Sequence, residues 1–355
     1  MSAEPQAQAA AGAGRGLGPS PLLRRALRLL ISVALTFLGL LFVTFIIGRV
    51  VPIDPVVAIV GDRAPPDVYE RVRLELGLDR PLIEQFWIYL TKSLQGDFGT
   101  SVLTSRPVLD DIFHFFPATL ELATVATLIG VLVGVPMGVV AAVNRGRWPD
   151  HLIRVAGLVG YSVPVFWLGL VGLLVFYARL DWVAGPGRLD IYFEDIVPTI
   201  TGLILVDSAI AGEWEVFNNA LSHLVLPATI LGYFSLAYIA RMTRSFMLEQ
   251  LGQEYIITAR VKGLSEARVV WRHALGSILV PLITVVALSY AYLLEGAVLT
   301  ETVFAWPGLG LYITRSLFNA DMNAVLGGTI VVGTCFIGLN LLSDMLYQLV
   351  DPRAR

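Results

Sequence analysis

The stretch at residues 118–143 reads ATLELATVATLIGVLVGVPMGVVAAV and carries one charged side chain, Glu121. An α-helix rises about 1.5 Å per residue, so a helix over this stretch is longer than the roughly 30 Å of hydrocarbon in a bilayer. A helix also satisfies its own backbone hydrogen bonds, which lipid cannot do for it. The stretch therefore predicts a transmembrane helix.

The whole chain has the composition of an integral membrane protein. Of its 355 residues, 56% are hydrophobic and 15% are charged, and the mean hydropathy is +0.72. Its apolar runs are continuous, which favours an all-α membrane protein over the alternating segments of a β-barrel. We expect about six transmembrane helices, at residues 27–47, 118–143, 153–177, 224–246, 278–299 and 325–348.

Arginine and lysine residues gather on one side of this predicted bundle. Six crossings place both termini on one side, and the positive-inside rule makes the cation-rich side cytoplasmic. The cations assigned to it are Arg15, Arg24, Arg25, Arg28, Arg145, Arg147, Arg154, Arg241, Arg244, Arg260, Lys262, Arg268, Arg272, Arg353 and Arg355. The first loop on the opposite side is acidic, with Asp54, Asp62, Asp67, Glu70, Glu75, Asp79, Glu84, Asp97, Asp110 and Asp111.

Composition also divides the chain and excludes some partners. Residues 1–21 have almost no large apolar side chains, which predicts a disordered cytoplasmic tail before a transmembrane domain at 22–355. The net charge of -3, with dispersed basic residues, does not suggest a nucleic-acid partner. Cys335 is the single cysteine, so neither an intramolecular disulfide nor a cysteine-based metal site is expected.

The first outer loop, residues 48–117, predicts a folded subdomain. Acidic residues after a proline pair suit a helix start near Asp67, Gly77 suits its end, and a second helix is expected from Pro81. A turn of two glycines and an aspartate follows at Gly96, Asp97, Phe98 and Gly99. This turn either closes the subdomain or contacts a partner protein.

Small residues and prolines mark the second and third spans. Gly130, Gly134 and Gly138 recur at every fourth residue and so share one helix face, which predicts a seam for close helix packing rather than a direct role in transport. Pro136 and Pro164 lie in mid-span, where each can kink its helix.

Two carboxylates fall inside predicted spans, Glu121 and Glu295. A charge at mid-bilayer costs about 2.5 to 3.5 kcal/mol on insertion scales, so such residues are candidates for function. Both are expected toward the outer face. They are interpreted either as an outer gate or substrate path, or as side chains that reach the interface.

The chain lacks a nucleotide-binding loop of the form GxxxxGK[ST]. Its two lysines, Lys92 and Lys262, follow Thr91 and Val261 in place of the required glycine. Any work done with ATP must therefore come from another chain.

The longest cytoplasmic loop, residues 248–276, predicts a helix, a break and a second helix with Ser265 at its start. The second helix combines an apolar face with the cations Arg268, Arg272 and His273. This helix is interpreted either as one that transmits movement to the bundle from its cytoplasmic side, or as a membrane-surface helix that neutralises anionic lipid head groups.

The sequence resembles the permeases of the ABC importer family for dipeptides, oligopeptides and nickel over nearly its whole length. The matching segments are Tyr255–Leu264 with Arg272–Leu275 and Pro281, Gly96–Gly99 with Ser101, Pro117–Leu122, Ser162–Trp167, His223–Pro227, Arg241–Ser245, Glu301–Gly310 and Asn340–Arg353.

The resemblance implies the fold of an ABC type I importer permease in a bacterial inner membrane. It implies as partners a second homologous permease, two ATPase subunits that bind ATP and Mg, and an external solute-binding protein, with no cofactor in this chain. Coupling to the ATPase is assigned to Glu254, Tyr255, Ala259, Arg260, Lys262, Gly263, Leu264, Arg272 and His273.

The leading hypothesis is the permease subunit of an ATP-driven importer of di- or oligopeptides or similar small solutes, with no catalysis in this chain. The alternative is an ion-coupled secondary transporter, in which Glu121 and Glu295 would carry protons at the midplane. A passive channel would leave the cytoplasmic loop without a purpose.

Overall fold

A computed structural model describes residues 21–50, 55–61, 63–75 and 77–350. Across these ranges the chain is almost entirely helical, and the β-structure is a single isolated bridge between Thr100 and Pro107. The tail expected at 1–21 lies outside the described residues up to position 20. Arg15, Asp54, Asp62, Arg353 and Arg355 also lie outside them.

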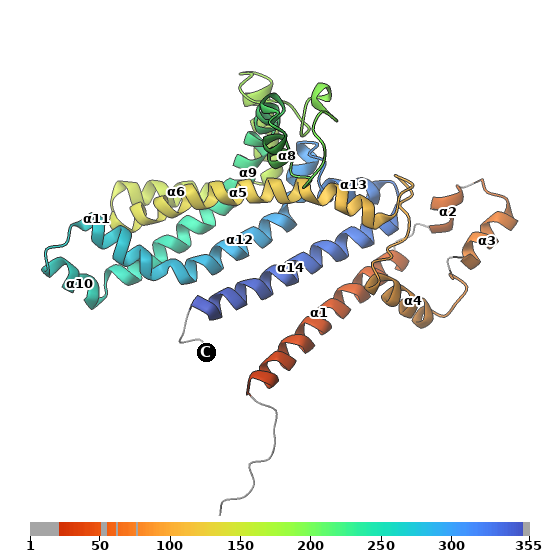
Figure 1. Ribbon diagram of the computed structural model, residues 1–355, viewed down its shortest axis with the longest axis horizontal. Helices are drawn as coiled ribbons and strands as arrows, with labels where there is room; N and C mark the ends of the chain where they lie inside the picture. Colours follow the sequence, from red (N-terminus) through yellow and green to blue (C-terminus); the bar gives the residue numbers. More distant parts are fainter. Residues whose placement is uncertain (1–20, 51–54, 62, 76, 351–355) are drawn as a thin grey trace, which may run out of the picture.

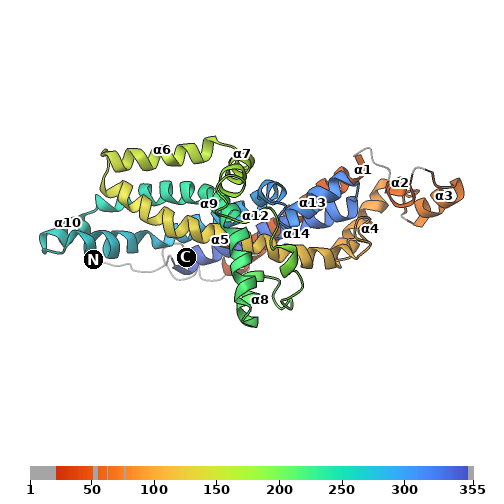
Figure 2. The same cartoon turned by 90° about the horizontal axis from the view of Figure 1, so that it is seen from above.

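Among the described residues, five helices are long and apolar enough to cross a bilayer, and a bent pair of helices can make a sixth span. The five are α1 (Pro21–Val50), α5 (Val108–Val143), α9 (Trp214–Leu251), α12 (Leu275–Val303) and α14 (Met322–Val350). α5 and α9 form the most extensive helix pair, α12 packs on both and on α14, and α1 packs on α14 (Figures 1 and 2). This arrangement confirms helices at five of the six predicted spans.

The third predicted span, residues 153–177, has a sharp bend at Pro164, one of the two prolines expected to kink a span. It is divided into α6 (Trp148–Ser162) and α7 (Val165–Gly172), and the two axes differ by 100°. The residue before a proline is driven out of the helical region, and Val163 has an extended backbone ahead of Pro164. Pro136, in contrast, lies inside the uninterrupted helix α5.

The shorter helices lie at the two ends of the bundle. At the end predicted to face outward, called the outer side below, they are α2 (Pro55–Val60), α3 (Pro66–Glu75), α4 (Leu82–Leu94), α8 (Ile204–Ala211), α13 (Leu309–Phe318), a π-helical turn at Leu173–Tyr177 and a 3-10 turn at Ile191–Phe193. On the other side they are α10 (Glu254–Val261), α11 (Glu266–Arg268) and a π-helical turn at Val269–Ala274.

The predicted glycine seam on α5 is confirmed. A Cβ added at Gly130 would lie 2.7 Å from Cβ of Ser235, and one at Gly138 would lie 2.6 Å from the carbonyl oxygen of Ala240. From the other helix, a Cβ at Gly232 would lie 2.8 Å from the carbonyl oxygen of Ala126. The glycines therefore let the backbones of α5 and α9 approach closely, as small residues do in membrane helix pairs.

Two helix starts lie earlier than hydropathy predicts. α5 begins at Val108 and not at 118, because Pro107 starts the helix and Asp110 and Asp111 in its first turn favour the positive end of the helix dipole. α9 begins at Trp214 and not at 224. Both first turns carry acidic side chains, Asp110 and Asp111 in α5 and Glu215 in α9, which interrupt the apolar pattern.

The outer subdomain follows its predicted pattern of helices. α3 ends at Glu75 before Gly77, whose φ of +66° suits a helix stop, and α4 begins directly after Pro81.

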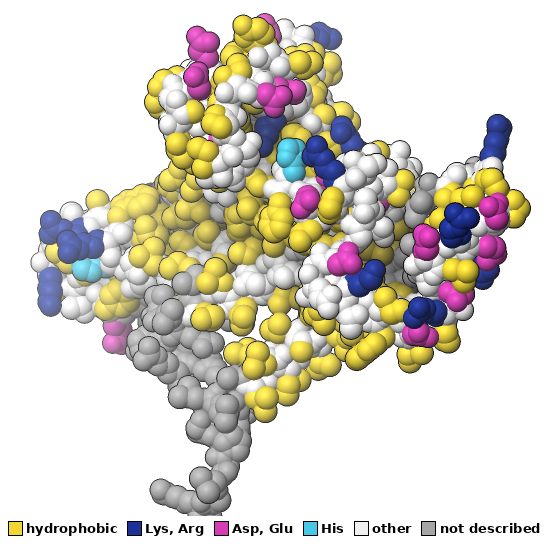
Figure 3. Space-filling view, turned by 45° about the vertical axis from the view of Figure 1, so that its right-hand side comes forward, with side chains coloured by type: hydrophobic (Ala, Val, Ile, Leu, Met, Phe, Trp, Pro, Cys, Tyr) yellow, Lys and Arg dark blue, Asp and Glu magenta, His cyan; other side chains and the backbone are white. Residues whose placement is uncertain are grey.

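Around the bundle, large hydrophobic side chains of several helices are exposed, among them Leu35, Leu132 and Leu170, and Figure 3 shows apolar atoms over its middle. Such a surface suits contact with lipid tails.

Candidate functional site

The segment after α9 forms the predicted helix, break and helix. α10 ends in a Schellman motif, in which the N–H of Leu264 donates to the carbonyl of Ala259 (3.2 Å) and that of Gly263 to the carbonyl of Arg260 (2.9 Å). Gly263 supplies the left-handed residue that this motif needs, with a φ of +79°. Ser265 takes the start of the next helix, but its side chain makes no capping hydrogen bond.

One face of α10 is anchored to the bundle. Ile256 is fully buried and Ala259 nearly so, in an apolar cluster with Met247 of α9 and Val269 and Ile278 of the following helices. A fully buried isoleucine side chain stabilises by roughly 1.5 to 3 kcal/mol, so α10 is held to the ends of α9 and α12. Ala259, assigned to coupling from sequence, thus lies on the anchored face.

The other face of α10 presents apolar side chains to solvent. Ile257 and Val261 are exposed there, Val261 by 82%. Exposed apolar side chains grouped on a short helix outside the bundle are typical of a contact with another protein. Figure 3 shows Lys and Arg side chains gathered at this end of the molecule.

The other predicted coupling residues surround this face. Glu254, Lys262, Gly263 and Arg272 are exposed, whereas Leu264 and His273 are half-buried. The Arg260 guanidinium binds the Glu266 carboxylate through two bonds of 2.8 and 3.2 Å, across the Gly263 turn. The Tyr255 hydroxyl lies 3.0 Å from Gln250 Oε1 and 3.1 Å from Ser277 Oγ, which links α10 to α9 and α12.

The chain that follows the Gly263 turn continues into a span without a break. α11, the π-helical turn and α12 run as one helical stretch from Glu266 to Val303. π-Helical turns occur often at functional sites in proteins. A force applied to α10 therefore reaches both α9 and α12, the two helices to which it is attached.

At the outer end, the Gly96–Gly99 turn packs onto α14. Gly96 and Gly99 have φ values of +78° and +81°, as predicted for this turn. Phe98 lies against Gly327, and a Cβ at Gly99 would lie 3.0 Å from Asn323 Nδ2. The next residues continue the contact, because Ser101 Oγ donates to the buried carboxylate of Asp321 (2.5 Å).

A second outer network is centred on Asp111 of α5. It accepts hydrogen bonds from Thr104 Oγ1 and from the hydroxyl of Tyr312 in α13 (3.0 Å). Burial, together with the bond to Asp111, raises the pKa of Tyr312, so the phenol stays protonated and donates. These bonds fix the outer loop to the first turn of α5 and join α5 to α13.

Of the two carboxylates predicted in spans, Glu121 has a partner that sequence analysis missed. Glu121 is 5% exposed. Arg188, in the segment between α7 and α8 that is called the outer segment below, binds Oε2 of Glu121 through two bonds of 3.1 and 2.6 Å. Glu121 Oε1 also accepts from the N–H of Leu205 at the start of α8 (2.8 Å). Glu295 is exposed on α12 instead and takes no part in the Glu121–Arg188 ion pair.

A third carboxylate, Glu301, was also missed. It is fully buried and accepts from Thr119 Oγ1 (2.6 Å) and from the N–H of Leu311 (2.9 Å). Side chains at Gly308 and Gly310 would collide with it, so glycines there allow the 301–310 loop to close around the carboxylate. In the sequence, the two glycines of this loop are the feature that could have indicated a buried side chain packed against it. Within the described ranges, no group of three or more His, Cys, Asp or Glu residues is placed to hold a metal ion.

Two family models match the chain. Residues 134–355 match the binding-protein-dependent transport system inner membrane component, and residues 22–123 match the N-terminal part of such membrane components. The chain belongs to this family. Its members are transport permeases and not enzymes, and the match agrees with the resemblance drawn from the sequence motifs.

Named relatives of this permease cover nearly its whole length. The probable D,D-dipeptide transport system permease protein DdpB of Escherichia coli K12 is 46% identical over 91% of this chain and 94% of its own length. The di/tripeptide transport system permease protein DppB of Pseudomonas aeruginosa is 43% identical over 90% of this chain and 95% of its own. These relatives support the importer hypothesis and not the ion-coupled alternative.

Among solved structures, a chain of the MetNI methionine ABC transporter in inward-facing conformations is similar to the permease. It covers 66% of this chain and 93% of its own length, with 17% identity and a TM-score of 0.48.

Proposed function

We propose that the chain is the inner-membrane permease subunit of an ATP-driven importer of dipeptides, oligopeptides or similar small solutes. The observation that carries the proposal is the exposed apolar face of α10, which is anchored to α9 and α12 and continuous with a span. The substrate class rests on relatives named for dipeptide and di/tripeptide transport.

The proposed partners are those of a binding-protein-dependent system. Two ATPase subunits bind ATP and Mg, because this chain has no nucleotide-binding loop, and this chain itself holds no cofactor. One ATPase receives α10 and the Gly263 turn in a groove, and its closure upon ATP binding moves α9 and α12. A second, homologous permease completes the translocation path.

The outer side is proposed to meet a solute-binding protein. The Gly96–Gly99 turn forms part of that contact, supported by the exposure of Asp97 and Gly99. Glu121 and Glu295 belong to the outer gate or path: the Glu121–Arg188 pair joins the outer segment to α5, and Glu295 is exposed on α12. Both termini are proposed to be cytoplasmic.

The proposal is tested by purifying the permease from its native membrane and reconstituting the complex that accompanies it. Glu254→Lys and Gly263→Val each change the proposed ATPase contact, by charge and by an unfavourable backbone conformation respectively. We expect both variants to lower peptide uptake about tenfold while the complex still assembles. ATP hydrolysis and uptake are measured in the same proteoliposomes.

Matched variants at the same positions serve as controls. Glu254→Gln removes a charge without reversing it, and Gly263→Asn introduces a residue that tolerates positive φ. Both should retain at least half of the uptake. Recovery of the permease without any ATPase, or uptake that follows a proton gradient, would contradict the proposal.

A further inference from the structure

Arg241 on α9 is a cation that has no carboxylate partner in the described part of the chain. Its guanidinium carbon lies 4.9 Å from the ring centre of Tyr161 and 5.7 Å from that of Tyr238. Arg244, further along the same helix, instead binds Asp150 through two bonds of 2.6 and 2.9 Å. Arg241 is thus held by aromatic rings with its hydrogen-bonding edge left available.

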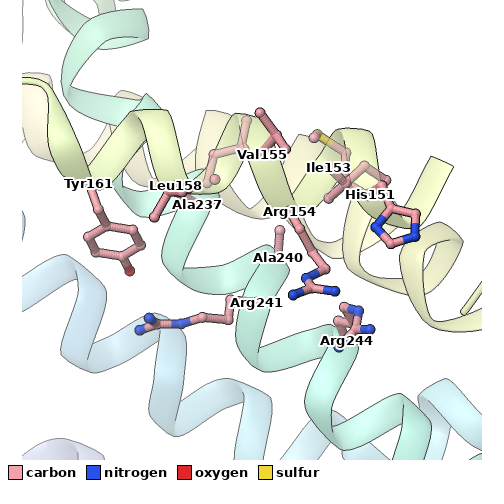
Figure 4. Close-up of a pocket in the computed structure, with 13 residues that line it drawn as sticks. His151, Ile153, Arg154, Val155, Leu158, Tyr161, Ala237, Ala240, Arg241 and Arg244 are labelled. Carbon is pink, nitrogen blue, oxygen red and sulfur yellow. The ribbon is translucent and has the colours of Figure 1, made fainter. Parts of the chain in front are cut away.

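Two cavities meet at this side chain. One, of about 390 Å³, lies between α6 and α9, and Figure 4 shows Arg154, Arg241 and Arg244 around it. The other, of about 420 Å³, extends to α12 and is lined by Ser235, Ser289 and Tyr292 among others. Both include Tyr161 and Arg241, so the guanidinium stands where the two spaces join.

This face of α9 is unsuited to lipid. Arg241 lies toward the cytoplasmic end of the predicted span 224–246 and is exposed in the single chain, where a cationic side chain suits water better than lipid tails. The opposite face of α9 is closed by α5 at the glycine seam. Ionisable residues within spans face a bundle interior or a water-filled cavity, so we expect Arg241 to face the solute path.

We propose that Arg241 binds the C-terminal carboxylate of a peptide as it passes, an inference that rests on the proposed import function. A guanidinium offers a planar pair of donors that matches a carboxylate, and aromatic rings hold it in a fixed orientation. Every unmodified peptide carries this carboxylate whatever its side chains. One arginine could therefore serve many peptides and still favour free acids over amides.

The test uses the reconstituted complex with its binding protein and two probes, trialanine and trialanine amide, each at a concentration that saturates the binding protein. The variants are Arg241→Gln, which removes the charge, and Arg241→Lys, which keeps it without the planar fork. Arg154→Gln is the matched control, because Arg154 lines only the first cavity. Uptake and ATP hydrolysis are both measured.

We expect Arg241→Gln to slow uptake of the free acid by roughly tenfold, as loss of a charge-assisted hydrogen bond predicts, and to leave amide uptake within about twofold. Arg241→Lys should retain part of the preference for the acid, and Arg154→Gln all of it. Unchanged acid uptake in Arg241→Gln, or equal losses for acid and amide, would overturn the inference. Failure of the unaltered complex to transport either probe with ATP would instead count against the proposed function.

Discussion

At the scale of single residues, the Glu121–Arg188 pair shows how a charge is kept inside a span. The side chains are 4% and 17% exposed, so each charge depends on the other. Breaking a buried pair by removing one partner typically costs about 3 to 5 kcal/mol. We expect Glu121→Gln to lower the thermal unfolding temperature of the detergent-solubilised permease clearly, as followed by tryptophan fluorescence.

The matched control removes both charges. In Glu121→Gln combined with Arg188→Met, no buried charge is left without a partner, so the double variant should be more stable than Glu121→Gln alone. A double variant whose loss equals the sum of the two single losses would show that the pair does not act as a unit.

Buried charged residues and their partners, such as Glu121 and Arg188, can be predicted from sequence only in part. The residue type and position of Glu121 mark it as unusual, but Arg188 is 67 residues away in a segment without periodicity. The bond from Thr119 to Glu301 joins residues 182 apart. Such partners depend on how the helices assemble, which local pattern does not encode. The proposed coupling residues could be named from sequence because they are adjacent along one loop, and their role stays a prediction.

At the scale of helices, the glycine seam tests whether close approach holds α5 to α9. In Gly138→Ala the new Cβ would lie 2.6 Å from both the Ala240 carbonyl oxygen and Thr243 Cβ, so one helix must shift. Overpacking of this kind costs about 1 to 3 kcal/mol. We expect a lower thermal unfolding temperature for this variant in detergent.

Gly157→Ala on helix α6 is the control, because a Cβ at this position would meet no neighbouring atom within 4 Å. Alanine is the better helix former by about 0.5 to 1 kcal/mol, so this change should leave stability equal or slightly higher. If both variants were destabilised alike, close contact across the seam would not be the cause.

The existence of the helices could be predicted from sequence better than their ends and bends. Continuous apolar runs specify that α5, α9, α12 and α14 exist, because burial in lipid demands them over a span. The same runs do not specify a bend. Residues 153–177 are apolar apart from Arg154 and Ser162. Whether Pro164 kinks a helix or ends it depends on the packing of α7 against α9 and α12.

At the scale of the whole molecule, the proposed ATPase contact and the proposed solute site lie on two consecutive helices, α10 and α9. α9 carries Arg241 in its span and is joined to α10 beyond its last turn. α12 lines one of the cavities at Arg241 and continues back to the same surface. A movement at α10 would thus change the walls of the cavity directly.

That scheme requires α10 to lie on the cytoplasmic side. The single natural cysteine allows a direct test, since Cys335→Ser removes the only background thiol. New cysteines are placed by Val261→Cys on α10 and by Ile191→Cys in the outer segment, at side chains that are 82% and 86% exposed. The positive-inside rule predicts that an impermeant maleimide labels only the second in intact spheroplasts. Both should react after the membranes are dissolved and the protein is denatured, which controls for partners that cover α10. Labelling of Val261→Cys from outside would reverse the orientation and with it the proposed ATPase contact.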